Sequence, residues 1–188
     1  MAYIDNLEEG MLALESGADS VCAKINLDYS HLTLEEISSL SLYAHRHNKK
    51  IFVSLDFMVR EEKWPKVIDI IIALNEIKPD ALIIQDLGVY YLLRHKFPHF
   101  TLYASRLMNI HNVLGVRQLK KMGFKRVALA CELSLREIEE IKKQVSTELE
   151  VLVHGRLHFS QQGLCLFSSF LCGKSNICLL YTSPSPRD

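Results

Sequence analysis

The 188-residue chain is 48% hydrophobic, which gives it enough apolar surface to bury the core of one ordinary domain. Its 22 Lys and Arg residues balance its 22 Asp and Glu residues, so no overall field draws it to nucleic acid or to anionic lipid. The N-terminal residues carry no basic or apolar run, and the richest apolar stretch, 67–77, is short and contains Asp69 and Asn75. Secretion and membrane spanning are therefore not expected.

The apolar pattern alternates between helices and strands along the first part of the chain. Asn6 is placed to cap the first helix, and an apolar strand follows at residues 20–25. Thr33 and Glu36 form the capping-box pattern at the start of a second helix. A second strand is expected at residues 50–56.

The same alternation continues to residue 154. The expected helices cover residues 63–77, 87–96, 112–122 and 133–145, and the expected strands cover residues 81–85, 101–105, 126–130 and 149–154. Runs such as residues 81–84 and 127–130 are apolar throughout, which is typical of strands covered on both faces. Repeated strand–helix pairs of this kind predict a parallel sheet.

Six expected strands and six expected helices precede Gly155, and the series starts with a helix. No glycine-rich phosphate loop follows the first expected strand, which disfavours a doubly wound dinucleotide-binding sheet. A (β/α)8 barrel has eight strands in ~250 residues. We therefore predict an incomplete (β/α)8 TIM-type barrel over residues 1–176, with its first strand and its C-terminal units missing.

Residues 177–188 leave the periodic pattern and contain the run Ser-Pro-Ser-Pro. We expect a non-native or disordered tail there, because residues 179–188 resemble translated adapter sequence. A native flexible terminus is the alternative.

Functional side chains in a βα-barrel gather at the carboxyl ends of its strands. The polar residues at these ends are Asp56, Gln85 with Asp86, Ser105 with Arg106, Glu132 and His154. Together they can bind and polarise a polar substrate, with Glu132 or His154 as general acid or base. Asp56 and Ser105 are the other candidate catalytic residues.

Three of these positions have structural interpretations as well. Capping of the next helix is the stronger interpretation for Asp86. Glu132 is equally suited to a favourable contact with the dipole of the following helix. His154 can also pack under the loop that it precedes.

The five cysteines form an odd set in a chain without a secretory signal, which favours a reducing cytoplasm. Cys165, Cys172 and Cys178 lie near His158, and such soft ligands can hold a metal ion or a cluster. Their C-x6-C-x5-C spacing lacks the C-x2-C pairs of typical zinc sites, so free cysteines are the alternative.

Five blocks of the chain, which together span residues 5–176, carry a family resemblance. They read NLEEGMLALESGADSV, LTLEEISSLSLYAHRHNKKIFVSLD, QDLGV, MGFKRVALACELSLREIEEI and ELEVLVHGRLHFSQQGLCLFSSFLCGKS. The positions that match the most specific pattern, E-x-F-x-x-G-x-L-C-x-x-x-x-G-x-C-x-x-S, are Glu150, Leu152, Gly155, Leu157, Gly163, Cys165 and Ser168. The sequence resembles the peptidase U32 family, the collagenase-like proteases.

Three positions depart from the family pattern. His158 stands where the family has its first signature cysteine, and Cys131 stands where an arginine is common. The stretch ASRLMN at residues 104–109 replaces the usual S-T-Q stretch. These departures suggest the alternative function, a non-catalytic, cluster-free binding or scaffold subunit derived from the family.

The resemblance implies a cytoplasmic enzyme domain with a barrel fold. Family members are described as peptidases, but several resemble oxygen-independent hydroxylation factors that carry an iron–sulfur cluster and act on tRNA, rRNA or a quinone precursor. The resemblance therefore implies proteolysis or hydroxylation, with a peptide, an RNA or a small aromatic molecule as substrate. It suggests Cys165, with His158 at the position of the first signature cysteine, as cofactor ligands, and a homomeric or heteromeric partner subunit. The cysteine spacing, rather than the resemblance, adds Cys178 to Cys165 as a candidate metal ligand.

Overall fold

The computed structural model describes residues 1–27 and 32–155. The strands are β1 (Ala2–Ile4), β2 (Ser20–Lys24), β3 (Lys50–Leu55), β4 (Ala81–Ile84), β5 (Leu102–Ala104), β6 (Arg126–Ala128) and β7 (Glu148–Glu150). The helices are α1 (Leu7–Glu15), α2 (Leu34–Arg46), α3 (Trp64–Ile77), α4 (Leu87–Lys96), α5 (Val113–Lys121) and α6 (Leu135–Gln144), with 3-10 turns η1 (Glu61–Lys63) and η2 (Arg106–Met108). The strands of the described part pair in chain order from β1 to β7, and every pair is parallel.

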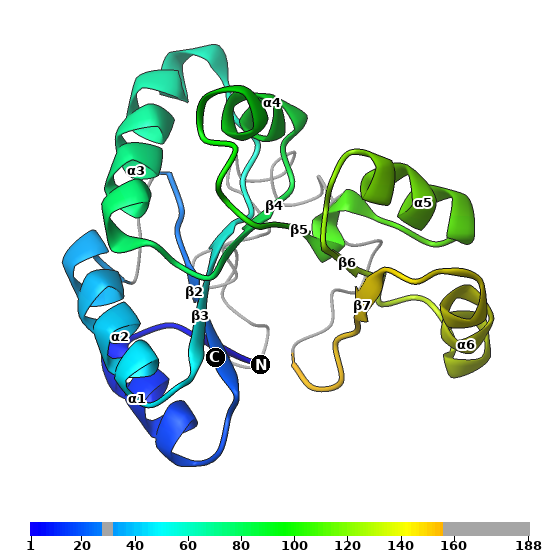
Figure 1. Ribbon diagram of the computed structural model, residues 1–188, viewed down its shortest axis with the longest axis horizontal. Helices are drawn as coiled ribbons and strands as arrows, with labels where there is room; N and C mark the ends of the chain where they lie inside the picture. The colour runs from blue at the N-terminus through cyan, green and yellow to red at the C-terminus, as the bar shows by residue number, and fades with distance from the viewer. Residues whose placement is uncertain (28–31, 156–188) are drawn as a thin grey trace, which may run out of the picture.

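The helices form an arc around the curled strands, and the arc is open between α6 and α1 (Figure 1). Seven consecutive parallel strands that alternate with helices confirm the predicted incomplete (β/α)8 barrel. One detail of the prediction is wrong, because the strand β1 precedes the first helix. Its three residues are too few to show a periodic pattern in the sequence. The predicted domain limit at residue 176 and the predicted tail lie outside the described residues.

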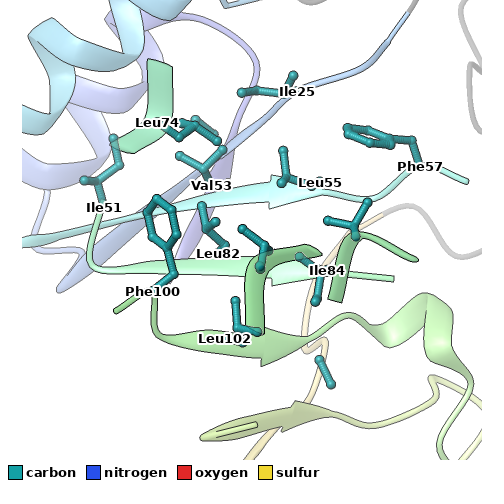
Figure 2. Close-up of a cluster of buried hydrophobic side chains, with 14 of the residues drawn as sticks. Ile25, Ile51, Val53, Leu55, Phe57, Leu74, Leu82, Ile84, Phe100 and Leu102 are labelled. Carbon is teal, nitrogen blue, oxygen red and sulfur yellow. The ribbon is translucent and has the colours of Figure 1, made fainter. Parts of the chain in front are cut away.

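Buried side chains cover both faces of the sheet, as the unbroken apolar runs predicted. On the outer face, Val53 and Leu82 belong to one large cluster with helix residues such as Leu74 (Figure 2). The inner face carries a second buried cluster, made of Cys22, Phe52, Ala81 and Ile83 with Tyr103 packed against it. Since strand residues alternate between faces, Asp56 continues the inward-facing series that begins at Phe52.

The helix starts follow the capping residues that the sequence indicated. The Asn6 side chain accepts a hydrogen bond from the Glu9 N–H at 2.8 Å at the start of α1. At α2, the Thr33 hydroxyl accepts from the Glu36 N–H at 3.1 Å, and the Glu36 carboxylate accepts from the Thr33 N–H at 2.7 Å. Both expected caps are confirmed, and they fix where the chain turns from loop to helix.

Arg126 is the centre of a polar network on the inner face of β6. Its guanidinium lies 2.5 Å from a carboxylate oxygen of Glu148 and 3.4 Å from one of Glu150. The guanidinium carbon also lies 4.3 Å from the ring centroid of Tyr103 and 5.2 Å from that of Phe52. The positive charge is therefore held between two rings and two carboxylates, which joins β6 to β7 and to the inner cluster.

The same network reaches the opposite edge of the sheet. The Tyr3 hydroxyl on β1 donates a hydrogen bond to the Glu150 carboxylate on β7 at 3.3 Å. β1 and β7 are the two ends of the strand order, so only a curled sheet brings them this close. Side chains thus span the opening that a closed barrel would fill with backbone pairing.

We expect the Arg126→Met variant to lose about 2 kcal/mol of the free energy of unfolding, because the substitution leaves two carboxylates without their cation. Urea denaturation at neutral pH measures this loss. The matched control is Arg136→Met, which removes an exposed i,i+4 pair with Glu140 and should cost about 0.5 kcal/mol or less. Equal losses in the two variants would show that the Arg126 network does not hold the sheet edges.

Candidate functional site

A cavity of about 710 Å³ lies between the two edges of the sheet. Its walls come from β1, from β6, and from the chain between Glu148 and Gly155, and Arg106 of η2 also lines it. This volume falls in the range that holds a small molecule or one unstacked base. Both Arg106 and Arg126 contribute to its surface, so it contains two positive charges.

The tips of three neighbouring strands carry a row of polar residues, and the last of these tips leads into Arg106, which lines the cavity. Leu55 pairs with Ile84, and Ile84 pairs with Ala104. The residues that follow these three, Asp56, Gln85 and Ser105, therefore stand side by side at the carboxyl end of the sheet. The alternation of side chains directs them to the inner face. The structure thus brings together the predicted residues of β3, β4 and β5.

Three atoms at these tips have no hydrogen-bond partner in the described part of the chain. They are Oδ1 of Asp56, Oε1 of Gln85 and Nε of Arg106, and each is buried. Asp56 is only 5% exposed. A buried polar atom without a partner is costly and rare in a folded protein, so these strand tips are the candidate functional site.

Asp86 and Ser105, by contrast, have partners that account for them. Oδ1 of Asp86 accepts hydrogen bonds from the Gly88 N–H at 2.7 Å and the Val89 N–H at 3.0 Å, which caps α4. The capping interpretation of Asp86 is therefore confirmed. The Ser105 hydroxyl accepts from the Leu107 N–H at 3.1 Å, and the residue is 1% exposed. Ser105 thus begins η2 and sets the position of Arg106.

The charges of Asp56 and Arg106 both act on the pKa of one buried thiol, that of Cys22. The Cys22 side chain is fully buried on the inner face of β2, and burial raises the pKa of its thiol well above the ordinary value. The charge of Asp56 raises this pKa further, whereas the charge of Arg106 lowers it. The sequence analysis missed Cys22 because it considered strand ends only. The alternation within β2 was the signal that could have found it.

Glu132 lies in the loop before α6 and contacts a histidine that the sequence analysis missed. Its carboxylate is 3.8 Å from Nε2 of His111, and Nδ1 of His111 donates to the Asn109 carbonyl at 2.9 Å. Glu132 does not begin the helix, since Ser134 caps α6 in a reciprocal pair with Glu137. A hydrogen bond joins the loop after η2 to the loop after β6, because the Ala130 N–H donates to the Ile110 carbonyl. His111 follows a turn rather than a strand, so strand ends did not indicate it.

His154 lines the cavity as an exposed residue beyond the end of β7. The expected strand over residues 149–154 is too long, because β7 ends at Glu150. His154 is therefore four positions past the strand. Its catalytic role stays a prediction.

The predicted metal and cofactor ligands Cys165, His158 and Cys178 lie outside the described residues. Within residues 1–27 and 32–155, no group of three or more His, Cys, Asp or Glu side chains is placed to hold a metal ion. The described part of the site therefore consists of hydrogen-bonding and charged groups. In the same residues, no helix has the length and apolar character needed to cross a membrane.

Comparison with known proteins decides the family. The model of peptidase family U32 matches residues 5–179. The chain belongs to peptidase family U32. It is 33% identical over 176 residues to tRNA hydroxylation protein P of Helicobacter pylori (strain ATCC 700392 / 26695). The matched region covers 90% of this chain and 42% of that protein.

Two further matches are an enzyme of rRNA modification and a solved structure. The chain is 32% identical over 143 residues to the 23S rRNA 5-hydroxycytidine C2501 synthase of Escherichia coli (strain K12), covering 76% of this chain and 21% of that enzyme. The structure of the U32 peptidase Mk0906 matches with a TM-score of 0.65 at 14% identity, over 80% of this chain and 66% of that one. The latter shows a shared fold. The U32 chain spans less than half the length of these two curated relatives.

We expect the Asp56→Asn variant to be as stable as the native protein or more stable by about 1 kcal/mol, because it removes a buried charge that lacks a full set of partners. Urea denaturation at pH 7 tests this. Asp80→Asn is the control, because the Asp80 carboxylate accepts from the Ile51 N–H at 2.9 Å and contacts His45 at 3.1 Å. That variant should lose about 1–2 kcal/mol. Equal losses at both positions would mean that Asp56 is satisfied in the folded protein.

The Cys131 thiol reports the charge of Arg106. Burial raises the pKa of Cys131, and the Arg106 guanidinium lowers it. Removing that cation in Arg106→Gln should raise the pKa and so reduce the thiolate fraction at pH 8, which slows alkylation by iodoacetamide. Peptide mass spectrometry measures the rate at Cys131. Arg136→Gln, on the exposed face of α6, should leave the rate unchanged, and the same rate in all three proteins would contradict the proximity of Arg106.

Proposed function

We propose that this chain is part of an RNA-hydroxylating enzyme of the U32 family, and that a base of tRNA or rRNA enters the cavity at the carboxyl ends of its strands. The observation that carries the proposal is the group of buried, inward-facing polar atoms at the strand tips, on Asp56, Gln85 and Arg106, of which Arg106 also lines that cavity. The names of the two curated relatives support RNA as the substrate class and hydroxylation as the reaction. Such an enzyme would work in the cytoplasm.

A base must leave its stack before an enzyme can act on one of its ring atoms. The cavity offers a partly open place for one base, with Arg106 and Tyr3 on its wall. The net charge of the chain is zero, so attraction to RNA would depend on local groups such as Arg106 rather than on an overall field.

The iron–sulfur cluster that the family resemblance implies stays a prediction. The described residues supply no set of three ligands for it, and we assign it no step. Acid–base groups are present without it, because the Nδ1–H of His111 donates to a backbone carbonyl and leaves Nε2 toward Glu132. We propose that this pair exchanges protons at the rim of the site.

Proteolysis has weaker support in the described residues. No serine of residues 1–27 and 32–155 hydrogen-bonds to a histidine, and the buried Ser105 hydroxyl accepts from a backbone N–H. A serine nucleophile needs an adjacent base. The geometry therefore favours binding of a polar ring over attack on a peptide bond.

The test expresses the protein in a bacterium that lacks its own tRNA hydroxylation protein. Digested tRNA and rRNA should then contain a nucleoside heavier by one oxygen atom, detected by liquid chromatography and mass spectrometry. Arg106→Gln should reduce that nucleoside at least about tenfold, because a lost charged hydrogen bond is worth that much. Arg136→Gln should leave it unchanged.

If the strain that expresses the wild-type protein contained no nucleoside with an added oxygen, the proposal would be refuted. Cleavage of denatured collagen by the pure protein would then favour the peptidase function. Absence of both activities would favour the binding or scaffold subunit.

A further inference from the structure

The charged residues of this chain are divided unequally between the two ends of the sheet. Every strand pair is parallel, so the first residues of the strands and the last turns of the helices share one end, which we call the amino-end face. From the last four residues of each helix to the first residue of the next strand, the described chain carries twelve Lys or Arg residues and five Asp or Glu residues. The amino-end face is therefore strongly basic, although the chain as a whole has no net charge.

The carboxyl ends of the strands have the opposite balance. From the residue after each strand to the fourth residue of the next helix, the described chain carries eleven Asp or Glu residues and five Lys or Arg residues. This end includes the candidate site, where Arg106 is one of the five cations. A phosphate backbone is repelled by an excess of carboxylates, so the general attraction to RNA has to arise elsewhere in the molecule.

The carboxylates of the amino-end face are largely neutralised by their neighbours. Three of the five lie close to a basic side chain, and these pairs are Asp19 with Lys49, Asp80 with His45, and Glu148 with Arg126. A fourth, Glu15, accepts a hydrogen bond from the Tyr43 hydroxyl at 2.9 Å. The exposed cations that form no ion pair with a carboxylate of the described residues are Arg46, Lys50, Lys78, Lys96, Lys121 and Lys125.

Part of this basic character has a purely structural reason. Cations in the last turn of a helix complement the helix dipole, and this accounts for Arg46, Lys96 and Lys121 at the ends of α2, α4 and α5. It does not account for Lys50, the first residue of β3, or for Lys125, which directly precedes β6. The effect of the dipole falls off beyond the last turn, so these two lysines add charge that the helices do not need.

Backbone pairing places the strand entries side by side along one edge. The Asp80 N–H donates to the Ile51 carbonyl, and the Lys125 N–H donates to the Leu102 carbonyl. β3 and β6 are three strands apart in the sheet order, so Lys50 and Lys125 are separated along the edge by about 14 Å. An arc of cations of this length can contact several successive phosphates of one nucleic-acid strand.

We propose that the amino-end face, through Lys50, Lys121 and Lys125, binds the phosphate backbone of the RNA whose base enters the cavity. This inference rests on the proposed function for RNA as the partner, and it adds the surface from which the affinity arises. α3 has 14 residues and is about 21 Å long, so the two ends of the barrel are close enough for one folded RNA to contact both. Because contacts with phosphates carry no sequence information, this face determines affinity and leaves the choice of base to the cavity.

The salt dependence of RNA binding tests the assignment. Fluorescence anisotropy measures the affinity of the full chain for labelled tRNA between about 50 mM and about 200 mM salt. The triple variant Lys50→Gln, Lys121→Gln, Lys125→Gln should bind at least about tenfold more weakly at the lower salt concentration. The slope of log affinity against log salt should become shallower by about 2, because three phosphate contacts are lost.

Two further variants control for net charge and for position. The triple variant Lys50→Arg, Lys121→Arg, Lys125→Arg keeps every charge and should retain both the affinity and the slope. Arg136→Gln removes an exposed cation at the opposite end of the barrel, and it should leave the slope unchanged. Urea denaturation checks that each variant is folded. Lys125→Gln alone should reduce the slope by about 1, which covers the case that the triple Gln variant does not fold.

Two binding results would overturn the inference. One is the same salt slope in the wild-type protein and in the Gln variants, and the other is binding of heparin without binding of RNA. Because binding is measured without turnover, the two proposals are separable. RNA hydroxylation together with an unchanged slope would refute the basic face alone. A slope that depends on the three lysines, without any hydroxylated nucleoside, would refute the proposed reaction alone.

Discussion

The architecture depends on the curl of a parallel sheet whose strands are buried on both faces. Helices cover the outer face, and polar side chains of the inner face pair with one another across the curl. Arg126 does this at the centre, between two carboxylates of β7 and two aromatic rings. Through Glu150 it also reaches Tyr3 on the far edge. Within the described residues, side chains connect the two edges of the sheet beside the cavity.

The two arginines that line the cavity differ in their partners. Arg126 is neutralised by its partners and contributes to stability. Arg106 has an unbonded Nε, follows the buried Ser105 cap, and has no described carboxylate as an ion-pair partner. A group held in place by backbone hydrogen bonds but left without its own partner is preorganised for a ligand. An unsatisfied polar group lowers the stability of the fold, and proteins tolerate such losses mainly at functional sites.

Much of this fold was predictable, and the reasons for the misses are physical. The apolar runs indicated β2 to β6 because burial on both faces removes polar residues from a strand, and Thr33 and Asp86 indicated helix starts because side-chain caps are local. β1 is too short for any period. β7 is shorter than its apolar pattern indicates, and its inner residues Glu148 and Glu150 pair with Arg126. Cys22 and His111 were missed because their roles depend on neighbours distant in the chain. Cys165 lies beyond the described residues.

One carboxylate links the site to its surroundings. Asp86 caps α4 through Oδ1, while its Oδ2 accepts from the Val59 N–H at 3.2 Å, three residues after Asp56. The segment that carries Asp56 and the first turn of α4 are therefore fastened to a single side chain. A shift of one tip would break hydrogen bonds that hold the other, so the Asp86 carboxylate couples the β3 and β4 tips. Groups whose positions are coupled before binding lose less ordering entropy when a ligand binds.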